Sequence, residues 1–151
     1  MRSTKAIVLP PGAGPQFVVL GDHMTLKIHG RDTGGIFSQM EASCQPQVGP
    51  PLHIHYREEE TFFVIEGEFE FVCGDLRTTG RPGTVVHLPR GVAHRFKNIG
   101  ESMGRLLITL TPAGAEDFFA EVGALTPEQQ SDLPKVAALA ARYGLEFVAH
   151  P

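Results

Sequence analysis

The sequence predicts an all-β fold of the jelly-roll type, a β-barrel or β-sandwich, with short helices toward the C-terminus. Short apolar runs bounded by turn residues recur over roughly the first 110 residues of the 151-residue chain. No helical periodicity separates these runs, and helix-type patterns begin only after about residue 113. Many short strands without intervening helices favour a closed barrel or jelly roll over a parallel sheet.

The expected strands are identified by their alternation and by the breakers between them. Residues 23–29 alternate apolar and polar side chains, as a half-buried strand does, and the turn at 30–35 ends this strand. A loop rich in Pro and Gly follows at 45–51, and a Gly-Asp turn at 74–75. The other expected strands are 36–43, 52–56, 60–67, 68–73, 83–89, 94–99 and 105–110.

The C-terminal part carries helix signals. Residues 115–123 read as a short amphipathic helix, and residues 126–129 combine a Thr cap, a Pro at the first helical position and a Gln three residues after the Thr. Residues 133–144 place apolar side chains on one stripe and end at a Gly. We expect these helices to pack on the outside of the β-structure. The whole chain, 1–151, is expected to form one domain, with a core at about 17–112 and a helical segment at about 113–151.

Composition excludes several classes of function. A net charge of −4 and a pI near 5.9 argue against nucleic acid or an anionic membrane as a partner. No apolar run approaches the length of a membrane span, and the run at 6–9 is too short for a signal-peptide core. Cys44 and Cys73 lack the spacing of a zinc or redox motif. We therefore expect a cytoplasmic protein with two structural thiols.

Histidines and glutamates interrupt the apolar strands in two ordered groups. His53 and His55 alternate along a strand, so their side chains share a face. The second group begins sixteen positions after the first one ends. The members are Gly49, His53, His55, Glu60 and Gly67 in the first group, and Gly83, Pro89, Gly91, His94 and Asn98 in the second.

These two groups resemble the two signature motifs of the cupin superfamily. The second group matches at every defined position, and the first matches at both histidines, the glutamate and the closing glycine. One departure is Gln47, which stands where the family has a glycine six positions before His53. The resemblance implies a small jelly-roll barrel with a metal near its centre, held by His53, His55, Glu60 and His94.

The chemistry of this set suits one divalent metal ion. Neutral imidazoles and a carboxylate are ligands for divalent iron, nickel, cobalt, manganese or zinc, and the set offers no thiolate. Four protein ligands on an octahedral ion leave two positions for water, oxygen or substrate.

Three consecutive glutamates leave the fourth ligand to be identified. Strand parity alone would place Glu59 beside the histidines, whereas the resemblance points to Glu60. Glu60 reaches inward only if a turn at residues 56–58 breaks the alternation. Glu58 and Glu59 would then lie at the barrel mouth, in solvent or hydrogen-bonded to the ligating histidines.

The remaining histidines lack the context of a motif. Those expected at the surface are His23, His29 and His150. His87, seven positions before His94, is favoured as a hydrogen-bonded strand residue. Its alternative role is at the metal, in place of Glu60 or as a catalytic acid or base. Glu60 is the other candidate catalytic residue, because a ligand carboxylate can also take a proton from a substrate hydroxyl.

Aromatic and apolar side chains are expected to line the cavity. The candidates for substrate contact are Phe37, Met40, Phe62, Phe71 and Phe96. Few Arg or Lys residues fall within the strands, so a flat, apolar, oxygen-bearing molecule is favoured over a strongly acidic one.

Two enzyme groups within the superfamily offer a chemistry. Residues 50–71, 111–114 and 139–147 look most like small cupins grouped with quercetin 2,3-dioxygenases, which implies a metal that binds a substrate oxygen and activates the ring toward O₂. Cupin-type aromatic polyketide cyclases are the alternative, and there the metal acts as a Lewis acid on a carbonyl. The sequence does not separate the two, and a ligand-binding barrel without catalysis is a third interpretation.

The expected partner is thus a small aromatic or polyketide-like molecule, with no nucleic acid and no membrane. Cupins often pair through their N-terminal strands, which makes a homodimer one expectation. The stretch at 10–15 could equally be a loose arm.

Overall fold

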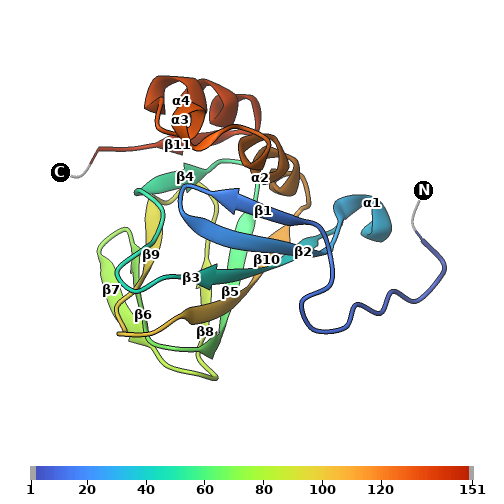
Figure 1. Ribbon diagram of the computed structural model, residues 1–151, viewed down its shortest axis with the longest axis horizontal. Coiled ribbons are helices and arrows are strands. Elements are labelled where there is room, and N and C mark those ends of the chain that lie inside the picture. Colours follow the sequence, from blue (N-terminus) through green and yellow to red (C-terminus); the bar gives the residue numbers. More distant parts are fainter. Residues whose placement is uncertain (1–2, 150–151) are drawn as a thin grey trace.

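A computed structural model describes residues 3–149, in which two antiparallel sheets face each other (Figure 1). One sheet has the order β1 (Gln16–Val19), β2 (Asp22–Ile28), β3 (Ser38–Cys44), β10 (Gly104–Thr111), β5 (Glu59–Glu66) and β8 (Val85–Leu88). The other has the order β11 (Leu145–Phe147), β4 (His53–His55), β9 (His94–Asn98), β6 (Phe69–Cys73) and β7 (Leu76–Gly80). The predicted all-β jelly roll is confirmed. Its sheets stay separate, so the fold is a sandwich and not a closed barrel.

Period-two burial builds the core between the sheets. In β3 and β10 every second residue is buried, and the two strands pair so that Met40 lies opposite Ile108 and Ala42 opposite Leu106. Aromatic side chains from both sheets meet in the middle, where Phe62 of β5 lies 5.2 Å, centroid to centroid, from Phe96 of β9.

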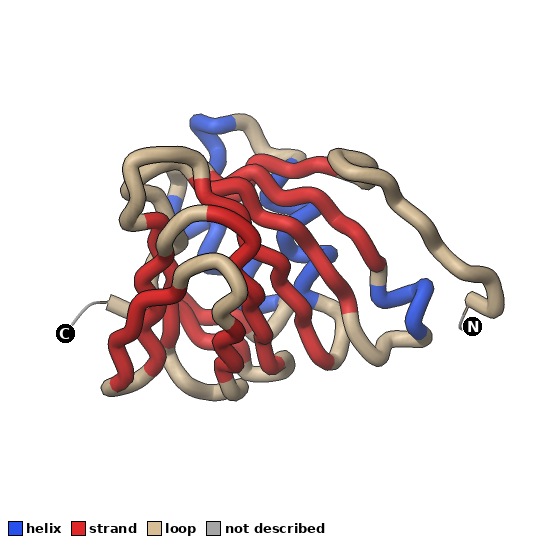
Figure 2. The backbone as a smooth tube through the Cα atoms, turned by 90° about the horizontal axis from the view of Figure 1, so that it is seen from below, coloured by secondary structure: helices blue, strands red, loops and turns tan. Residues whose placement is uncertain are grey.

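Three strands and one helix lie outside the expected pattern. The strands β1, β7 and β11 are short, and most residues of β7 are polar or exposed, so their sequences carry no clear alternation. Within the expected turn at 30–35 lies a one-turn helix, α1 (Gly30–Thr33), whose Arg31 N–H donates to the ring of His29. In Figure 2 the loop segment before β1 runs out past α1. Its last residues lie against β2, where Leu26 N–H donates to the Pro15 carbonyl and Lys27 Nζ donates to the Ala13 carbonyl.

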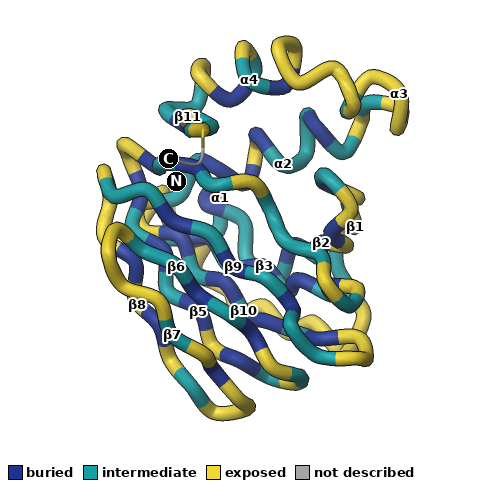
Figure 3. The backbone as a smooth tube through the Cα atoms, turned by 90° about the vertical axis from the view of Figure 1, so that its left-hand side faces the viewer, coloured by how far each residue is buried: buried dark blue, intermediate teal, exposed yellow. Residues whose placement is uncertain are grey.

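The C-terminal helices cover one end of the sandwich, as Figures 1 and 3 show. They are α2 (Ala115–Gly123), α3 (Pro127–Gln130) and α4 (Leu133–Arg142), close to the predicted positions. After these helices the segment adds a strand that was not expected: β11 joins the second sheet and pairs with β4 along its whole length. None of the helices between residues 3 and 149 is long and apolar enough to cross a membrane.

Candidate metal centre

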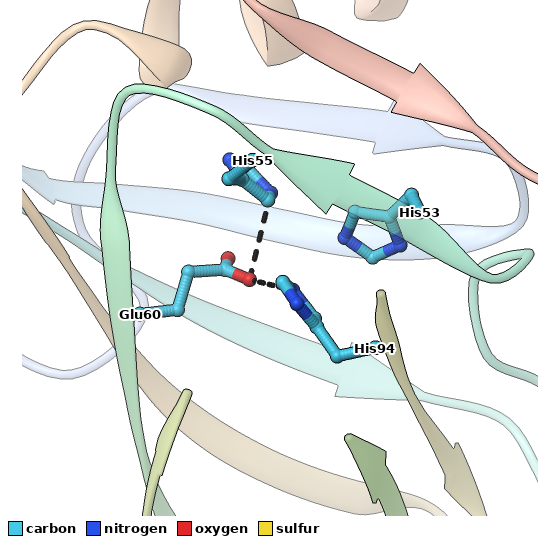
Figure 4. A group of neighbouring side chains, drawn as sticks. All are labelled: His53, His55, Glu60 and His94. Carbon is cyan, nitrogen blue, oxygen red and sulfur yellow. Dashed lines mark hydrogen bonds and ion pairs between the residues drawn. The ribbon is translucent and has the colours of Figure 1, made fainter. Parts of the chain in front are cut away.

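Three histidines and one glutamate converge between the two sheets (Figure 4). His53 and His55 lie on β4, and His53 is in register with His94 on the neighbouring β9. Glu60 enters from β5 of the opposite sheet. All four side chains are buried, and one ligand atom from each lies within 4.8 Å of the others.

A break in the strand brings Glu60 to this position. β4 ends at His55 and β5 begins at Glu59, so residues 56–58 interrupt the alternation as the sequence requires. From there, Glu60, Phe62 and Val64 are buried. The Glu59 carboxylate lies on the other side of β5 and is 40% exposed.

In each of the three imidazoles, the Nδ1 atom, which faces away from the cluster, lies beside a hydrogen-bond acceptor. His53 Nδ1 lies 2.8 Å from the Pro51 carbonyl, His94 Nδ1 lies 3.0 Å from the Val92 carbonyl, and His55 Nδ1 lies 3.3 Å from Glu58 Oε2. These contacts assign the proton to Nδ1 in each ring, which leaves the lone pair on Nε2. Glu58 is itself buried, so it supports the His55 ring from the side that faces away from the cluster.

The Nε2 atoms of His55 and His94 lie against Glu60. Glu60 Oε2 is 2.5 Å from His94 Nε2 and 3.5 Å from His55 Nε2. His55 Nε2 is buried without a hydrogen-bond partner. A buried, unpartnered nitrogen whose lone pair points at a carboxylate is costly unless a cation lies between them, so the cluster fits a divalent ion.

Electrostatics supports the same conclusion. Burial alone raises the pKa of Glu60, but the charges and hydrogen bonds of the histidines, led by His55, outweigh it and lower the value to about 2. Burial and the neighbouring His94 lower the pKa of His53 to about 3. The ionised Glu60 carboxylate and the neutral His53 imidazole are forms that bind metals. Burial lowers the pKa of His55, but Glu60 and Glu58 outweigh it and raise the value, so a metal ion binding there displaces a proton from His55.

A cavity of about 50 Å³ lies beside the cluster. His53 and Glu60 form part of its wall, Asp22 is the remaining charged member, and most of the wall is apolar. The other lining residues are Val19, Leu20, Met24, Pro50, Phe96, Ile108, Phe118, Phe119, Leu145 and Phe147.

Of the five side chains predicted to contact substrate, only Phe96 lines this cavity. Met40, Phe62 and Phe71 are fully buried in the core between the sheets. Phe37 precedes β3 on the parity opposite to Met40 and is only half-buried. These four side chains do not line the cavity, because alternation identifies the inward face of a strand but not its depth in the sandwich. Their contact with a substrate stays a prediction.

His87 does not face the cavity. Its side chain is 55% exposed on the outer face of the sheet, 3.0 Å from the hydroxyl of Thr61 and 3.6 Å from Glu59. The alternative that placed it at the metal is therefore wrong, and the favoured hydrogen-bonded strand histidine is what the structure shows. The alternation of β8 could have predicted this outward position, because Val86 and Leu88 on either side of His87 are buried.

The other two histidines within residues 3–149 have no polar contact with the cluster. His23 is exposed, as predicted. His29 is half-buried and lies 3.2 Å from Asp117, which ties α1 to α2. His150 lies outside the described residues.

Residues that sequence reasoning missed come from both ends of the chain. Asp22 and Met24 share the inward parity of β2. Phe118 and Phe119 come from α2, and Phe147 from β11. Parity could have identified Asp22, whereas local sequence gives no sign that the C-terminal segment reaches the cavity.

A wider groove of about 1060 Å³ lies between β1, residues 49–52 and the C-terminal helices. It contains none of the four clustered side chains. The cluster therefore borders the smaller cavity and not this groove.

Comparison with known proteins agrees with this geometry. Residues 40–110 match the cupin domain family. The chain is 35% identical over 57 residues (38% of its length) to an uncharacterised protein of Streptomyces coelicolor, and 37% identical over 60 residues (40% of its length) to protein SchB of Streptomyces halstedii. These matches span 53% and 44%, about half, of the relatives' own lengths.

Solved structures with the same fold include two of interest. KdgF from Halomonas sp. matches with a TM-score of 0.66 at 16% identity, over 76% of this chain and 99% of that one. The polyketide cyclase RemF from Streptomyces resistomycificus matches with a TM-score of 0.62 at 21% identity, over 71% of this chain and 80% of that one. At these identities the likeness concerns the fold.

Proposed function

We propose that this chain, a small cupin, is an enzyme that uses one divalent metal ion to act on a small aromatic or polyketide-like molecule. The observation that carries the proposal is the convergence of three buried imidazoles and one carboxylate at the wall of an apolar cavity. A ligand in that cavity would have its polar atoms at the cluster and its apolar surface against Phe96, Ile108 and Phe118.

The division of labour follows from the positions of the side chains. A bound divalent ion would supply Lewis-acid polarisation of a substrate oxygen. The backbone carbonyls of Pro51 and Val92, together with Glu58, hold the imidazole rings in one orientation. The apolar wall lowers the local dielectric constant and so strengthens charge interactions within the site.

Non-redox cyclisation is the reaction that we favour. Ring closure of a poly-β-ketone needs proton transfers as well as carbonyl polarisation, and the cavity has a carboxyl group, Asp22, apart from the cluster. The fold likeness to a protein described as a polyketide cyclase is consistent with this choice.

A quercetinase-like dioxygenase is the second candidate. The donor set favours it, since three imidazoles and a carboxylate also suit divalent iron, manganese, cobalt and nickel, which can take part in oxygen chemistry. A ligand-binding protein without catalysis would share the same cluster.

The size of the cavity adds a requirement. At about 50 Å³ it holds one or two water molecules, whereas pockets for drug-sized ligands measure roughly 300 Å³ or more. An aromatic substrate therefore needs part of the wall to move outward. Part of the wall is formed by α2, which belongs to neither sheet, and by the three-residue edge strand β11.

One experiment separates the three functions. The metal-loaded protein is incubated with a flavonol in an oxygen electrode and, separately, with a short aromatic poly-β-ketone whose cyclised product is followed by mass spectrometry. We expect a cyclised product without oxygen consumption. Oxygen uptake on the flavonol would favour the dioxygenase, and saturable binding without turnover of either compound would leave a binding protein.

A further inference from the structure

Asp22 is a charged side chain in an apolar wall. It is the first residue of β2, and with Met24 and Leu26 it belongs to the buried face of that strand. Only 4% of its surface is exposed, and it borders the same cavity as His53 and Glu60. The tight turn at Leu20 and Gly21, both with positive φ, fixes its backbone opposite Val19.

The Asp22 carboxylate is incompletely satisfied. Its Oδ1 atom is buried and has no hydrogen-bond partner. A buried acceptor without a donor destabilises a fold, and such groups are found where a ligand or a reaction uses them. The structure offers no cation in the wall around it, which distinguishes Asp22 from the ion-paired carboxylates on the surface of the described chain, such as Glu41 and Glu70.

We infer that Asp22 is a catalytic base that takes a proton from a carbon between two carbonyl groups of the substrate and returns it to an oxygen. The inference rests on the proposed function, because the substrate's carbonyl must be held at the cluster that borders the same cavity. It names the substrate class as a 1,3-dicarbonyl compound whose acidic C–H faces Asp22.

The proposed step balances without a co-reactant. The C–H bond of the methylene group breaks, and its proton goes to Asp22 Oδ1. The released electron pair forms a C–C bond to a second carbonyl carbon of the same molecule. The π electrons of that carbonyl move onto its oxygen, which takes the proton back from Asp22, so the step isomerises the substrate and oxidises nothing.

The surroundings of Asp22 suit a base near neutral pH. Burial raises the pKa of Asp22 from 3.8 to about 6, against smaller opposing effects of the Cys44 thiol on β3 and His23 on β2. The remaining neighbours in the wall, from β1, α2 and β11, are apolar, and the other ionisable groups that line the cavity are His53 and Glu60. Such a carboxylate is largely ionised at pH 7 and more basic than an exposed aspartate.

The test follows hydrogen–deuterium exchange of the methylene protons of ethyl acetoacetate in D₂O by NMR. Cobalt-loaded wild type is compared with Asp22→Asn, which keeps the shape of the side chain. Asp75→Asn, an exposed residue in the turn between β6 and β7, is the matched control. Circular dichroism and metal content verify that each variant is folded and loaded.

We expect Asp22→Asn to slow the protein-catalysed exchange by about 100-fold or more, the usual contribution of a general base. Asp75→Asn should catalyse exchange of the methylene protons at the wild-type rate. In the wild type the rate should rise as the pH passes through about 6, where Asp22 loses its proton. An exchange rate for Asp22→Asn within twofold of the wild-type rate would overturn the inference. So would a wild-type exchange rate that does not change between about pH 5 and 8, and this second test does not depend on the folding of a variant.

The visible spectrum of the cobalt protein tests the proposed function separately. A spectral change on addition of ethyl acetoacetate supports oxygen binding at the cluster. An unchanged spectrum with exchange that still depends on Asp22 would refute the metal's role and keep the base. A changed spectrum without catalysed exchange would refute the role of Asp22 as a base and keep the metal's role. An unchanged spectrum without catalysed exchange would refute both roles.

Discussion

Glu58 lies with its Oε2 atom 3.3 Å from Nδ1 of His55, and both side chains are buried. A carboxylate that accepts from the far nitrogen of a ligating imidazole fixes the ring and makes the other nitrogen a better donor. The residue between β4 and β5 is therefore expected to act on the metal through His55.

Replacing Glu58 by Gln should weaken metal binding by about 10- to 100-fold while the fold is retained. Competition with a chelator of known affinity measures this change. Glu59→Gln, the same substitution one residue along on an exposed side chain, is the matched control and should bind like the wild type. Equal affinities for the two variants would remove the role assigned to Glu58.

His87→Ala should leave metal binding, turnover and stability close to wild type, because this exposed side chain makes its polar contacts with Thr61 and Glu59 on the outer face. The expected change in the free energy of unfolding is within about 0.5 kcal/mol. Steady-state kinetics and urea unfolding measure these quantities. A large loss of turnover in His87→Ala would show that the outer-face position is not the functional one.

Asp22 should make stability depend on pH. Its pKa is higher in the folded protein, about 6, than the ordinary value of 3.8, so the folded state binds the proton more tightly than the unfolded state. The stabilising effect is complete below about pH 4 and is lost as the pH rises through 6. A difference of about two between the folded and unfolded pKa values corresponds to about 3 kcal/mol of unfolding free energy.

Asp22→Asn has no proton to lose, so its stability relative to wild type should increase by up to about 3 kcal/mol between pH 4 and pH 7. Urea unfolding of both metal-free proteins at the two pH values gives this difference, and the other titrating groups cancel in it. A difference that does not change with pH would mean that burial does not disfavour the charged form of Asp22. Loss of activity with a gain in stability is the usual signature of a functional residue.

Phe147 pairs with His53 across β11 and β4, and their ring centroids lie 6.4 Å apart. Because Phe147 forms part of the cavity wall, Phe147→Ala should widen the cavity and tighten the binding of a bulky flavonol. Fluorescence titration measures the affinity, and metal content should not change. Phe63→Ala, which removes the same ring from the exposed face of β5, is the control. No difference between these variants would mean that β11 does not limit access.

The parts of the site that the sequence predicts are those that depend on local pattern. The spacing of His53, His55 and His94 and the break before Glu60 are readable because parity and a family motif converge on the same residues. The same reasoning could have predicted that Asp22 points inward, since it lies two residues before Met24 on the same face of the strand.

The parts that could not be predicted depend on long-range contact. β11 has three residues and no alternation of its own, and it forms a strand because β4 offers a free edge. Phe62 and Phe71 lie in the core and not at the cavity because of the way the two sheets stack, which the sequence of a single strand does not determine. The cavity wall therefore combines residues from β1 and β2 with residues more than 90 positions away in α2 and β11.

The most direct test of the central claim is the metal content of purified protein by elemental mass spectrometry, for the wild type and for His94→Ala. His94 lies at the centre of the cluster, against Glu60 and stacked on His55. We predict close to one equivalent of a divalent transition metal in the wild type after reconstitution and little in the variant. A wild type that takes up no metal, or a variant that binds as much as the wild type, would contradict the assignment of this cluster as a metal centre.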